Sequence, residues 1–117
     1  MSIYRERGEL LRSLHQQAEL LVLPNPWDAG SAKMLAALGF HALATTSAGL
    51  AFSLGRRDAE GAVSRDEALA NARAIVEATA LPVVADLENG YGDTPEDCAA
   101  TAVSYTHLRA HETREDL

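Results

Sequence analysis

Three short apolar runs, separated by segments of helical periodicity, constrain the fold of this chain more than any other feature of the sequence. The runs are Leu20–Leu23, Ala42–Thr45 and Pro82–Asp86. The first is wholly apolar and is stopped by Pro-Asn-Pro, as expected for a strand that is covered on both faces. Strands that alternate with helices predict a parallel sheet with right-handed crossovers. The pattern therefore predicts an α/β fold, either a closed barrel or a doubly wound open sheet.

The segments around these runs carry helical signals. Ile3–Gln17 places its apolar residues on one face and predicts an amphipathic first helix. Asp28 can cap a helix over 29–38, which a glycine ends. Further helices are predicted over 64–79, which opens with a Ser-Arg-Asp-Glu capping box, and through 94–103, which opens with Thr-Pro-Glu-Asp. The predicted order is one helix followed by three strand–helix units.

One long segment, after Gly49 and up to Ser64, follows neither period. It carries further glycines together with Arg56, Arg57 and Asp58. Long irregular segments inside compact domains are usually functional loops, which is our prediction here. Taken alone, however, a charged cluster of this kind is most often simply solvated.

Composition narrows the classes of function. The 117 residues are 47% apolar and carry a formal charge of −7, which predicts one globular domain and disfavours nucleic acid or an anionic membrane as a partner. No apolar run is long enough to span a membrane, and the first residues lack the order of a signal peptide. The lone cysteine, Cys98, cannot form an internal disulfide, and we interpret it as buried in a helix. Together these features predict a cytoplasmic protein that acts on a small molecule.

The segment Asp86–Gly92, with the sequence Asp-Leu-Glu-Asn-Gly-Tyr-Gly, is the strongest chemical signal. It ends the third predicted strand, and strand alternation would place Asp86 and Glu88 on the same face. Two carboxylates in one mouth suit Mg²⁺, which takes one or two protein carboxylates and completes its shell with water and substrate. From spacing alone, the competing interpretation is that both acids are solvated loop residues or helix caps.

Three motifs give this signal a context. They are Pro-Asn-Pro-Trp-Asp-Ala at 24–29, Thr-Thr-Ser-Ala-Gly at 45–49 and the segment 86–92. Their order and spacing resemble the isocitrate lyase/phosphoenolpyruvate mutase family over about 20–103. The resemblance implies the N-terminal three strand–helix units of a (β/α)8 TIM barrel, preceded by one amphipathic helix. Such a barrel typically needs about 250 residues, so the chain would supply three of its eight strands.

The resemblance also implies a metal site. In that family the third motif usually reads Asp-Ala-Asp-x-Gly-Tyr-Gly, with the first aspartate on Mg²⁺ and the second holding metal-bound water. Mg²⁺ is therefore the implied cofactor, with Asp86 and Glu88 as the metal-binding residues. The sequence departs from the pattern at Leu87 and at Glu88, whose carboxylate reaches one methylene further.

A substrate site and a reaction follow from the same resemblance. The turn with Thr45, Thr46 and Ser47 would bind the carboxylate and oxo group of the substrate, and Asp58 would be a catalytic residue on a gating loop. Trp27, beside the first strand, is a further candidate for the wall of the substrate pocket. The implied reaction of this lyase is cleavage of a C–C or P–C bond in a small 2-oxo or 2-hydroxy carboxylate through an enolate. Members of the family are commonly homo-oligomers.

Residues 104–117 break the pattern of the domain, because an alanine-rich helix gives way to Tyr105, histidines and charged side chains. The segment resembles translated adapter sequence. We therefore predict a partial barrel domain over 1–103 and an artefactual or disordered tail, in which His107 and His111 are not metal ligands. The chain by itself would then be inactive.

Two other classes of protein compete with this interpretation. A complete small α/β binding module that oligomerises through its sheet edges is the alternative. A doubly wound nucleotide-binding domain is disfavoured, because no G-x-G-x-x-G or G-x-x-x-x-G-K-[ST] sequence follows the first predicted strand.

Overall fold

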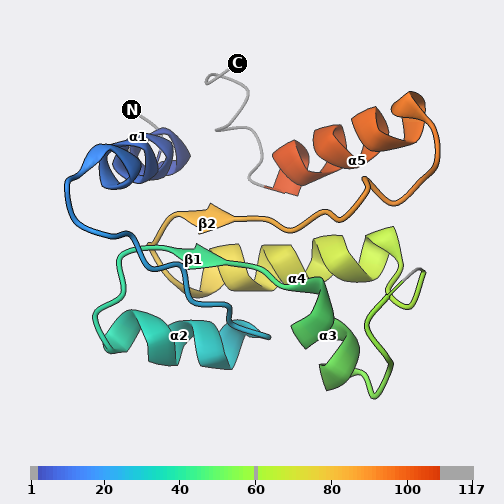
Figure 1. Ribbon diagram of the computed structural model, residues 1–117, viewed down its shortest axis with the longest axis horizontal. Coiled ribbons are helices and arrows are strands. Elements are labelled where there is room, and N and C mark those ends of the chain that lie inside the picture. Colours follow the sequence, from blue (N-terminus) through green and yellow to red (C-terminus); the bar gives the residue numbers. More distant parts are fainter. Residues whose placement is uncertain (1–2, 60, 109–117) are drawn as a thin grey trace.

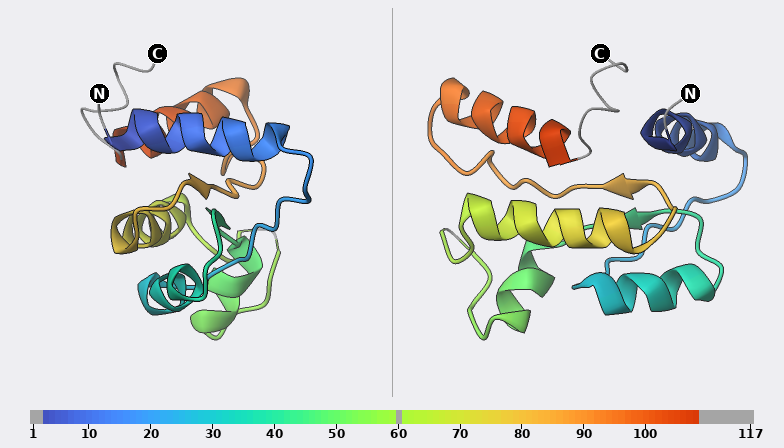
Figure 2. Two further views of the ribbon diagram at one scale, coloured as in Figure 1. Left: turned by 90° about the vertical axis from the view of Figure 1, so that its left-hand side faces the viewer. Right: turned by 180° about the vertical axis from the view of Figure 1, so that it is seen from behind.

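The structure is a computed structural model that describes residues 3–59 and 61–108 of the chain (Figure 1). The elements of this part, in chain order, are α1 (Ile3–Gln16), α2 (Ala29–Ala37), β1 (Leu43–Ala44), α3 (Ser47–Ser53), α4 (Arg65–Ala78), β2 (Val83–Val84) and α5 (Pro95–Leu108). Helices α1 and α5 lie on one side of the two strands and α2 and α3 on the other, with α4 packed alongside (Figures 1 and 2).

The two strands form a parallel pair. Leu43 pairs with Val83, and Ala44 with Val84. One further ladder bond, from Thr45 N to Val84 O at 2.8 Å, follows the paired residues. The second and third predicted strands and their parallel arrangement are thus confirmed, although each strand is shorter than predicted. The fold class is α/β, as the alternation of elements predicts.

The prediction of a strand at Leu20–Leu23 is wrong, because this segment is not a strand in the described part of the chain. The residue that follows this segment does contact β1, because Ala44 N donates a hydrogen bond to Pro24 O at 3.0 Å. Pro24 and Pro26 have no N–H to donate, so the ladder cannot continue through them. Leu20 is 89% exposed, so the run also lacks the cover that its composition suggests. The described residues contain two strand–helix units where three were predicted.

Helix α4 supplies the centre of the core. Ile75 and Val76, on its predicted apolar stripe, are buried against Ala32 of α2, Leu43 of β1 and Val83 of β2. Helix α4 also contacts α2 and α5, so the three helices follow one another along the strand pair (Figure 2). Burial of this stripe stabilises the packing of α4 against the two strands.

Helix α1 is tied to the end of α4. The Arg7 guanidinium donates to Val76 O at 3.0 Å and to Thr79 O at 2.6 Å. The last carbonyls of a helix have no partner within the helix, and the negative end of its dipole favours a cation. Leu14, on the predicted apolar face of α1, is buried. The first helix is therefore confirmed, with Leu14 of its predicted apolar face buried and Arg7 bound to the end of α4.

Side-chain caps start three helices where the sequence places them. Asp28, Ser64 and Thr94 each accept a hydrogen bond from the backbone N–H three residues further on, at 2.8, 3.1 and 3.1 Å. Such caps satisfy N–H groups that the first turn leaves free. The predicted starts of α2, α4 and α5 are thus confirmed.

Helix α3 occupies the first part of the segment predicted to be a loop. Thr46 caps it by accepting from Gly49 N at 3.1 Å, and Leu50 and Ala51 are buried. The helix has only seven residues, which is too short to show a helical period in the sequence. The irregular segment is therefore shorter than predicted and begins at Leu54.

Helix α5 runs past the end expected at Val103 and reaches Leu108. Residues 104–108 contain neither glycine nor proline, so nothing in them stops a helix. The half-buried Tyr105 also donates through its hydroxyl to Val83 O at 3.4 Å. The domain boundary at 104 stays a prediction, and the described side chains do not include those of His107 and His111.

Apolar side chains are also found on the outer surface. Met34 of α2 and Leu38, which caps the end of α2, are 68% and 73% exposed. They line a groove of about 390 Å³ together with residues 25–28.

No helix of the described part is both long enough and apolar enough to cross a membrane.

Candidate active site

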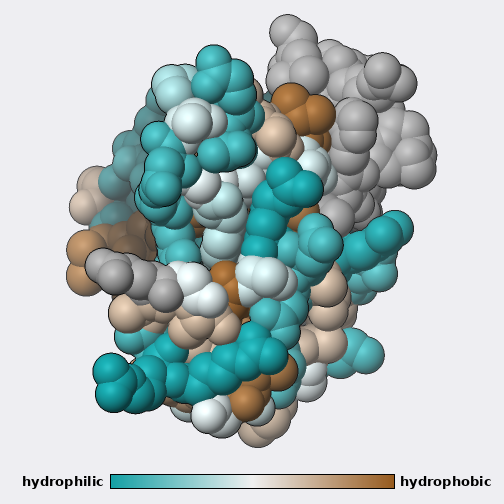
Figure 3. Space-filling model, turned by 90° about the vertical axis from the view of Figure 1, so that its right-hand side faces the viewer, coloured by the Kyte–Doolittle hydropathy of each residue, from teal (hydrophilic) through white to brown (hydrophobic). Residues whose placement is uncertain are grey.

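The carboxyl ends of β1 and β2 lie at one edge of the sheet, because the strands are parallel. The described segments that follow the strands, 45–59 with 61–64 and 85–94, extend to the right-hand side of Figure 1. Residues within 61–65 and 88–93 line one cavity there. Figure 3 shows this end of the molecule, where hydrophilic residues predominate. Parallel α/β sheets bind their ligands outside the carboxyl ends of the strands. This edge is therefore the candidate active site.

Asp86 is the best-fixed carboxylate at this edge. Its Oδ2 accepts from Ser47 N at 3.3 Å and from Ser47 Oγ at 3.1 Å, and its Oδ1 accepts from Glu88 N at 3.0 Å. Its own N–H donates to Thr45 Oγ1 at 2.8 Å. The structure thus joins the predicted metal residue Asp86 to the predicted substrate-binding turn.

The three hydroxyl residues of this turn have different local roles. Thr45 is buried and its hydroxyl accepts the hydrogen bond from Asp86 N. Thr46 caps α3. Ser47 alone directs its hydroxyl at the Asp86 carboxylate. The structure brings these residues together with Asp86, and their contacts with substrate stay a prediction.

Trp27 lies against the start of α3, on the same side of the fold as this turn. A Cβ added at Gly49 would lie 2.2 Å from Trp27 Cδ1, so the indole packs directly on the glycine. Its ring also meets Phe52 edge-on at a centroid distance of 6.1 Å, and its carbonyl accepts from Asn71 Nδ2 at 2.8 Å. The side chain is 46% exposed. Trp27 is therefore part of the packing and still presents surface near the predicted substrate turn.

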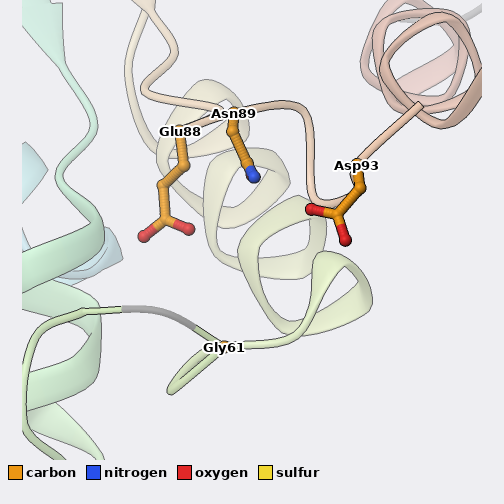
Figure 4. A pocket seen from close by; sticks show the side chains of 4 residues that line it. All are labelled: Gly61, Glu88, Asn89 and Asp93. Atoms are coloured by element: carbon orange, nitrogen blue, oxygen red, sulfur yellow. The ribbon is translucent and has the colours of Figure 1, made fainter. Parts of the chain in front are cut away.

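Glu88 lines the candidate site, but not through the strand alternation that we predicted. Strand β2 ends at Val84, and Glu88 has φ +49°, so strand alternation does not set its direction. Its exposed side chain lines a cavity of about 550 Å³ with Gly61, Asn89 and Asp93. These side chains project from the segment after β2 towards the loop that carries Gly61 (Figure 4). Asn89 and Asp93 have the sequence signal of polar residues after a strand, but we did not predict them as site residues.

The turn that carries Glu88 is tightly built. Glu88, Gly90 and Tyr91 all have positive φ, at 49°, 84° and 61°. Non-glycine residues with such angles cost free energy and are most frequent at functional sites. The turn is held to α5 because Cys98 Sγ donates to Asn89 O at 3.0 Å. Cys98 is nevertheless exposed, which corrects the expectation that it is buried.

Tyr91 is a second residue of this motif, after Asn89, that sequence analysis missed. Its ring packs against the cluster that contains Leu50 and Val63. Its hydroxyl oxygen is buried and has no hydrogen-bond partner in the described part of the chain. Burial, with a smaller contribution from the charges of Glu88 and Asp86, raises the pKa of Tyr91 to about 12. The phenol therefore stays protonated at neutral pH, close to both predicted metal residues.

The irregular segment is held at its base by an ion pair. Arg56 Nη1 donates to Glu67 Oε1 at 2.6 Å and to Ala62 O at 3.0 Å. The Arg56 hydrogen bond, with a second from Ser64 N, lowers the pKa of Glu67 to about 2. Asp58 lies in the span between these anchors. Within the described residues it is exposed, makes no hydrogen bond or ion pair and does not line the cavity, so the structure does not bring it to Asp86.

The side-chain donors predicted to bind metal at this edge are carboxylate oxygens, a ligand type that Mg²⁺ takes. In the described part, no group of three or more His, Cys, Asp or Glu side chains is arranged to hold a metal ion. Structural zinc sites need four such ligands, mostly cysteine and histidine. Mg²⁺ is commonly held by one or two carboxylates and keeps water and substrate oxygens for the rest of its shell. Asp86 and Glu88 match that requirement in number and in donor type.

The sequence model of the phosphoenolpyruvate phosphomutase family matches residues 11–111. The chain belongs to this family. Among its curated relatives, 2,3-dimethylmalate lyase of Eubacterium barkeri is 39% identical over 84 residues, which cover 71% of this chain and 29% of the relative. An uncharacterised protein of Mycobacterium tuberculosis is 41% identical over 86 residues, which cover 74% of this chain and 33% of the relative.

Solved structures of the phosphoenolpyruvate mutase/isocitrate lyase superfamily share the fold. A candidate lyase/mutase of Burkholderia cenocepacia J2315 has a TM-score of 0.87 and 46% identity, and the match covers 93% of this chain and 39% of that one. For a crystal structure of 2,3-dimethylmalate lyase the TM-score is 0.75 and the identity 30%, with 92% and 38% covered. For oxaloacetate acetylhydrolase with its product oxalate the values are 0.74 and 32%, with 87% and 35% covered. The chain thus spans about a third of the length of the relatives it matches.

Proposed function

We propose that this chain forms the metal- and substrate-binding edge of a Mg²⁺-dependent (β/α)8-barrel enzyme of the lyase type. The enzyme would cleave a C–C or P–C bond in a small 2-oxo or 2-hydroxy carboxylate through an enolate. The observation that carries the proposal is the position of Asp86, whose carboxylate accepts three hydrogen bonds where both strands end. The relatives support this chemistry, since one is 2,3-dimethylmalate lyase and another is an oxaloacetate acetylhydrolase with bound oxalate.

Asp86 and Glu88 would hold the Mg²⁺ ion. When bound, the ion supplies Lewis-acid stabilisation for the negative charge that develops on the substrate oxygen. Donors behind a ligating carboxylate fix its orientation, and Ser47 already plays this part for Asp86. Glu88 has no such donor in the metal-free fold of the described residues, so its orientation would be set when the site fills.

The substrate carboxylate would lie beside the turn that begins α3. We assign its binding to Thr45, Thr46 and Ser47, because this turn is hydrogen-bonded to Asp86 and its side chains are small and polar. The hydroxyls of Thr45 and Thr46 only accept hydrogen bonds within the fold, so each keeps its proton to donate to a carboxylate, whereas the Ser47 hydroxyl already donates to Asp86. Thr46 is the less buried of the two threonines and would contribute most of the side-chain recognition. Trp27, packed on the start of α3, would shield one side of the substrate from water.

Asp58 would take part only after its segment moves. We propose that the span between Arg56 and Glu67 closes over the cavity at Glu88, which Gly61 of the same span already lines. Closure of such a loop excludes water and completes a catalytic arrangement. In that closed state Asp58 would be the catalytic residue nearest to the metal.

Replacement of Asp86 by asparagine in the full-length protein tests the proposal. Asp86→Asn removes one charge from the metal site while keeping a similar shape, so Mg²⁺ binding and Mg²⁺-dependent turnover should both be lost. Asp66→Asn is the matched control, because Asp66 lies on α4 with its side chain 91% exposed. Titration calorimetry with Mg²⁺ and assays with 2,3-dimethylmalate and oxaloacetate provide the two readouts. Full Mg²⁺-dependent activity in Asp86→Asn would show that the metal site lies elsewhere.

The same proposal has consequences for residues 1–117 alone and for the full-length enzyme. Residues 1–117 alone should show no turnover, because they span about a third of the relatives' length. The full-length enzyme would be a cytoplasmic homo-oligomer. Its formal charge over this chain, −7, agrees with a small carboxylate substrate bound through a cation and not with nucleic acid.

A further inference from the structure

Two residues beside the cavity at the strand edge, Tyr91 and Glu88, have polar groups that make no hydrogen bond within the described residues. The Tyr91 hydroxyl is buried and makes no hydrogen bond within the described residues. The Glu88 carboxylate also lacks a hydrogen bond there, since only its backbone N–H is engaged. Both residues line the same cavity of about 290 Å³. A buried hydroxyl without a partner destabilises a fold, so its presence needs an explanation.

Packing does not explain the hydroxyl. The Tyr91 ring contacts the apolar cluster of Leu50, Val63 and Ala68, which phenylalanine would fill equally well. The backbone fixes where the ring points, because Tyr91 has φ +61° and its N–H donates to Asn89 Oδ1 at 3.1 Å. The hydroxyl is thus held at a defined place, buried behind the cavity that its residue lines, without a hydrogen bond from the described residues.

The two predicted metal residues differ in how they are oriented. Both side chains are exposed. Asp86 accepts three hydrogen bonds, whereas the Glu88 carboxylate accepts none within the described residues and sits on a longer side chain with one more rotatable bond. Both charges act on Tyr91, with Glu88 the stronger of the two. The phenol carries its proton at neutral pH and is therefore available as a donor to a carboxylate.

We propose that Tyr91 is a positioning residue for the metal site, whose hydroxyl donates a hydrogen bond to the Glu88 carboxylate when the site holds Mg²⁺. The inference rests on the function proposed above. The bond supplies the missing partner of a buried donor and restricts a flexible metal-binding side chain at the same time. Donors of this kind behind a ligand commonly change metal affinity by a factor of about 10–100.

The test uses Tyr91→Phe in the full-length protein, beside the wild type, Asp86→Asn and Ser13→Ala. Ser13→Ala is the control, because it removes a hydroxyl that has a partner, Glu9 O, on α1 and that does not line the cavity. Mg²⁺ binding is measured by calorimetry and the midpoint of thermal unfolding is measured in EDTA. Tyr91→Phe should bind Mg²⁺ about tenfold more weakly, while its midpoint in EDTA should equal or exceed that of the wild type. Ser13→Ala should leave Mg²⁺ affinity unchanged.

Each contrary result has a distinct meaning. If Tyr91→Phe binds Mg²⁺ as tightly as the wild type while Asp86→Asn does not bind it, the inference fails and the proposed function stands. A lower midpoint for Tyr91→Phe in EDTA also overturns the inference, because the hydroxyl would then have a partner in the metal-free fold. If the wild type itself binds no Mg²⁺, the proposed function and the inference both fail.

Discussion

Replacing Gly90 by alanine tests how tightly the turn between β2 and α5 is built. Gly90 has φ +84°, where alanine costs about 1–2 kcal/mol more than glycine. Its Cβ would lie 2.6 Å from Cys98 Sγ and 2.8 Å from Cys98 Cα, and overpacking of this kind costs about 1–3 kcal/mol. The two effects together predict a loss of about 2–5 kcal/mol in the free energy of unfolding.

Two other glycines separate these contributions. Gly55 has φ +74° but no atom lies within 4 Å of an added Cβ, so Gly55→Ala carries the backbone cost alone. Gly8 in α1 has neither the positive angle nor a close neighbour. Gly8→Ala should be neutral or stabilising by up to about 1 kcal/mol, because alanine favours a helix interior. Stability should therefore decrease in the order Gly8→Ala, Gly55→Ala, Gly90→Ala.

Urea unfolding followed by circular dichroism measures these differences. For a small domain the free energy of unfolding falls by about 1–3 kcal/mol per molar urea, so a loss of about 2 kcal/mol lowers the midpoint by roughly 1 M. A Gly90→Ala midpoint equal to that of Gly55→Ala would refute the reasoning. The close contact between the turn and α5 would then contribute nothing to stability.

Two further predictions concern the segments beside the site. In Gly49→Ala the added Cβ would lie 2.2 Å from Trp27 Cδ1, so the indole must move into solvent. The fluorescence emission of this single tryptophan of the chain should therefore shift to the red. An unchanged spectrum would contradict the packing of Trp27 on Gly49. Arg56 is the main cause that lowers the pKa of Glu67 from 4.5 to about 2. Because the folded pKa is depressed, the charge on Glu67 stabilises the fold above about pH 4.5 and this contribution is lost as the pH falls towards 2. Glu67→Gln should therefore be less stable than the wild type at neutral pH and equally stable near pH 2, as measured by unfolding across that range, and a difference independent of pH would contradict the assignment.

The helix starts could be predicted because their chemistry is local. A cap needs only one short polar side chain and the N–H groups of the next turn, and Asp28, Ser64 and Thr94 provide this within three residues. The parallel pairing also followed, since a helical segment between two strands leaves few other connections. The family was correctly inferred from three motifs, two of which directly follow β1 and β2.

The errors arose where a structure depends on distant residues. Leu20–Leu23 has the composition of a covered strand, yet its pairing with β1 stops at Pro24 and Leu20 lies open to solvent. Helix α3 is stabilised by the burial of Leu50 and Ala51, which no local period reveals. The direction of Glu88 depends on a backbone angle that a strand would not have. None of these three features can be read from alternation or helical spacing.

The site was predictable in position but not in its connections. Asp86 and the turn at 45–47 were placed at one edge, and the hydrogen bonds between Ser47 and Asp86 join them there. Sequence analysis missed Tyr91, although it lies inside the strongest motif, because an aromatic residue after a strand is usually assigned to packing. Only the structure shows that its hydroxyl is buried without a partner among the described residues.

The same few contacts determine both the sheet and the first metal residue. Thr45 N donates to Val84 O in the strand ladder, and the Thr45 hydroxyl accepts from Asp86 N immediately beyond it. The pairing of β1 with β2 therefore fixes Asp86 relative to Ser47 before any ligand binds. The backbone N–H of Glu88 joins this network through Asp86 Oδ1, but its carboxylate stands outside it, on a turn that is also held to α5 through Asn89 and Cys98. A site with one preset and one adjustable carboxylate can accept a hydrated ion and then tighten around it, because only Glu88 must be ordered on binding.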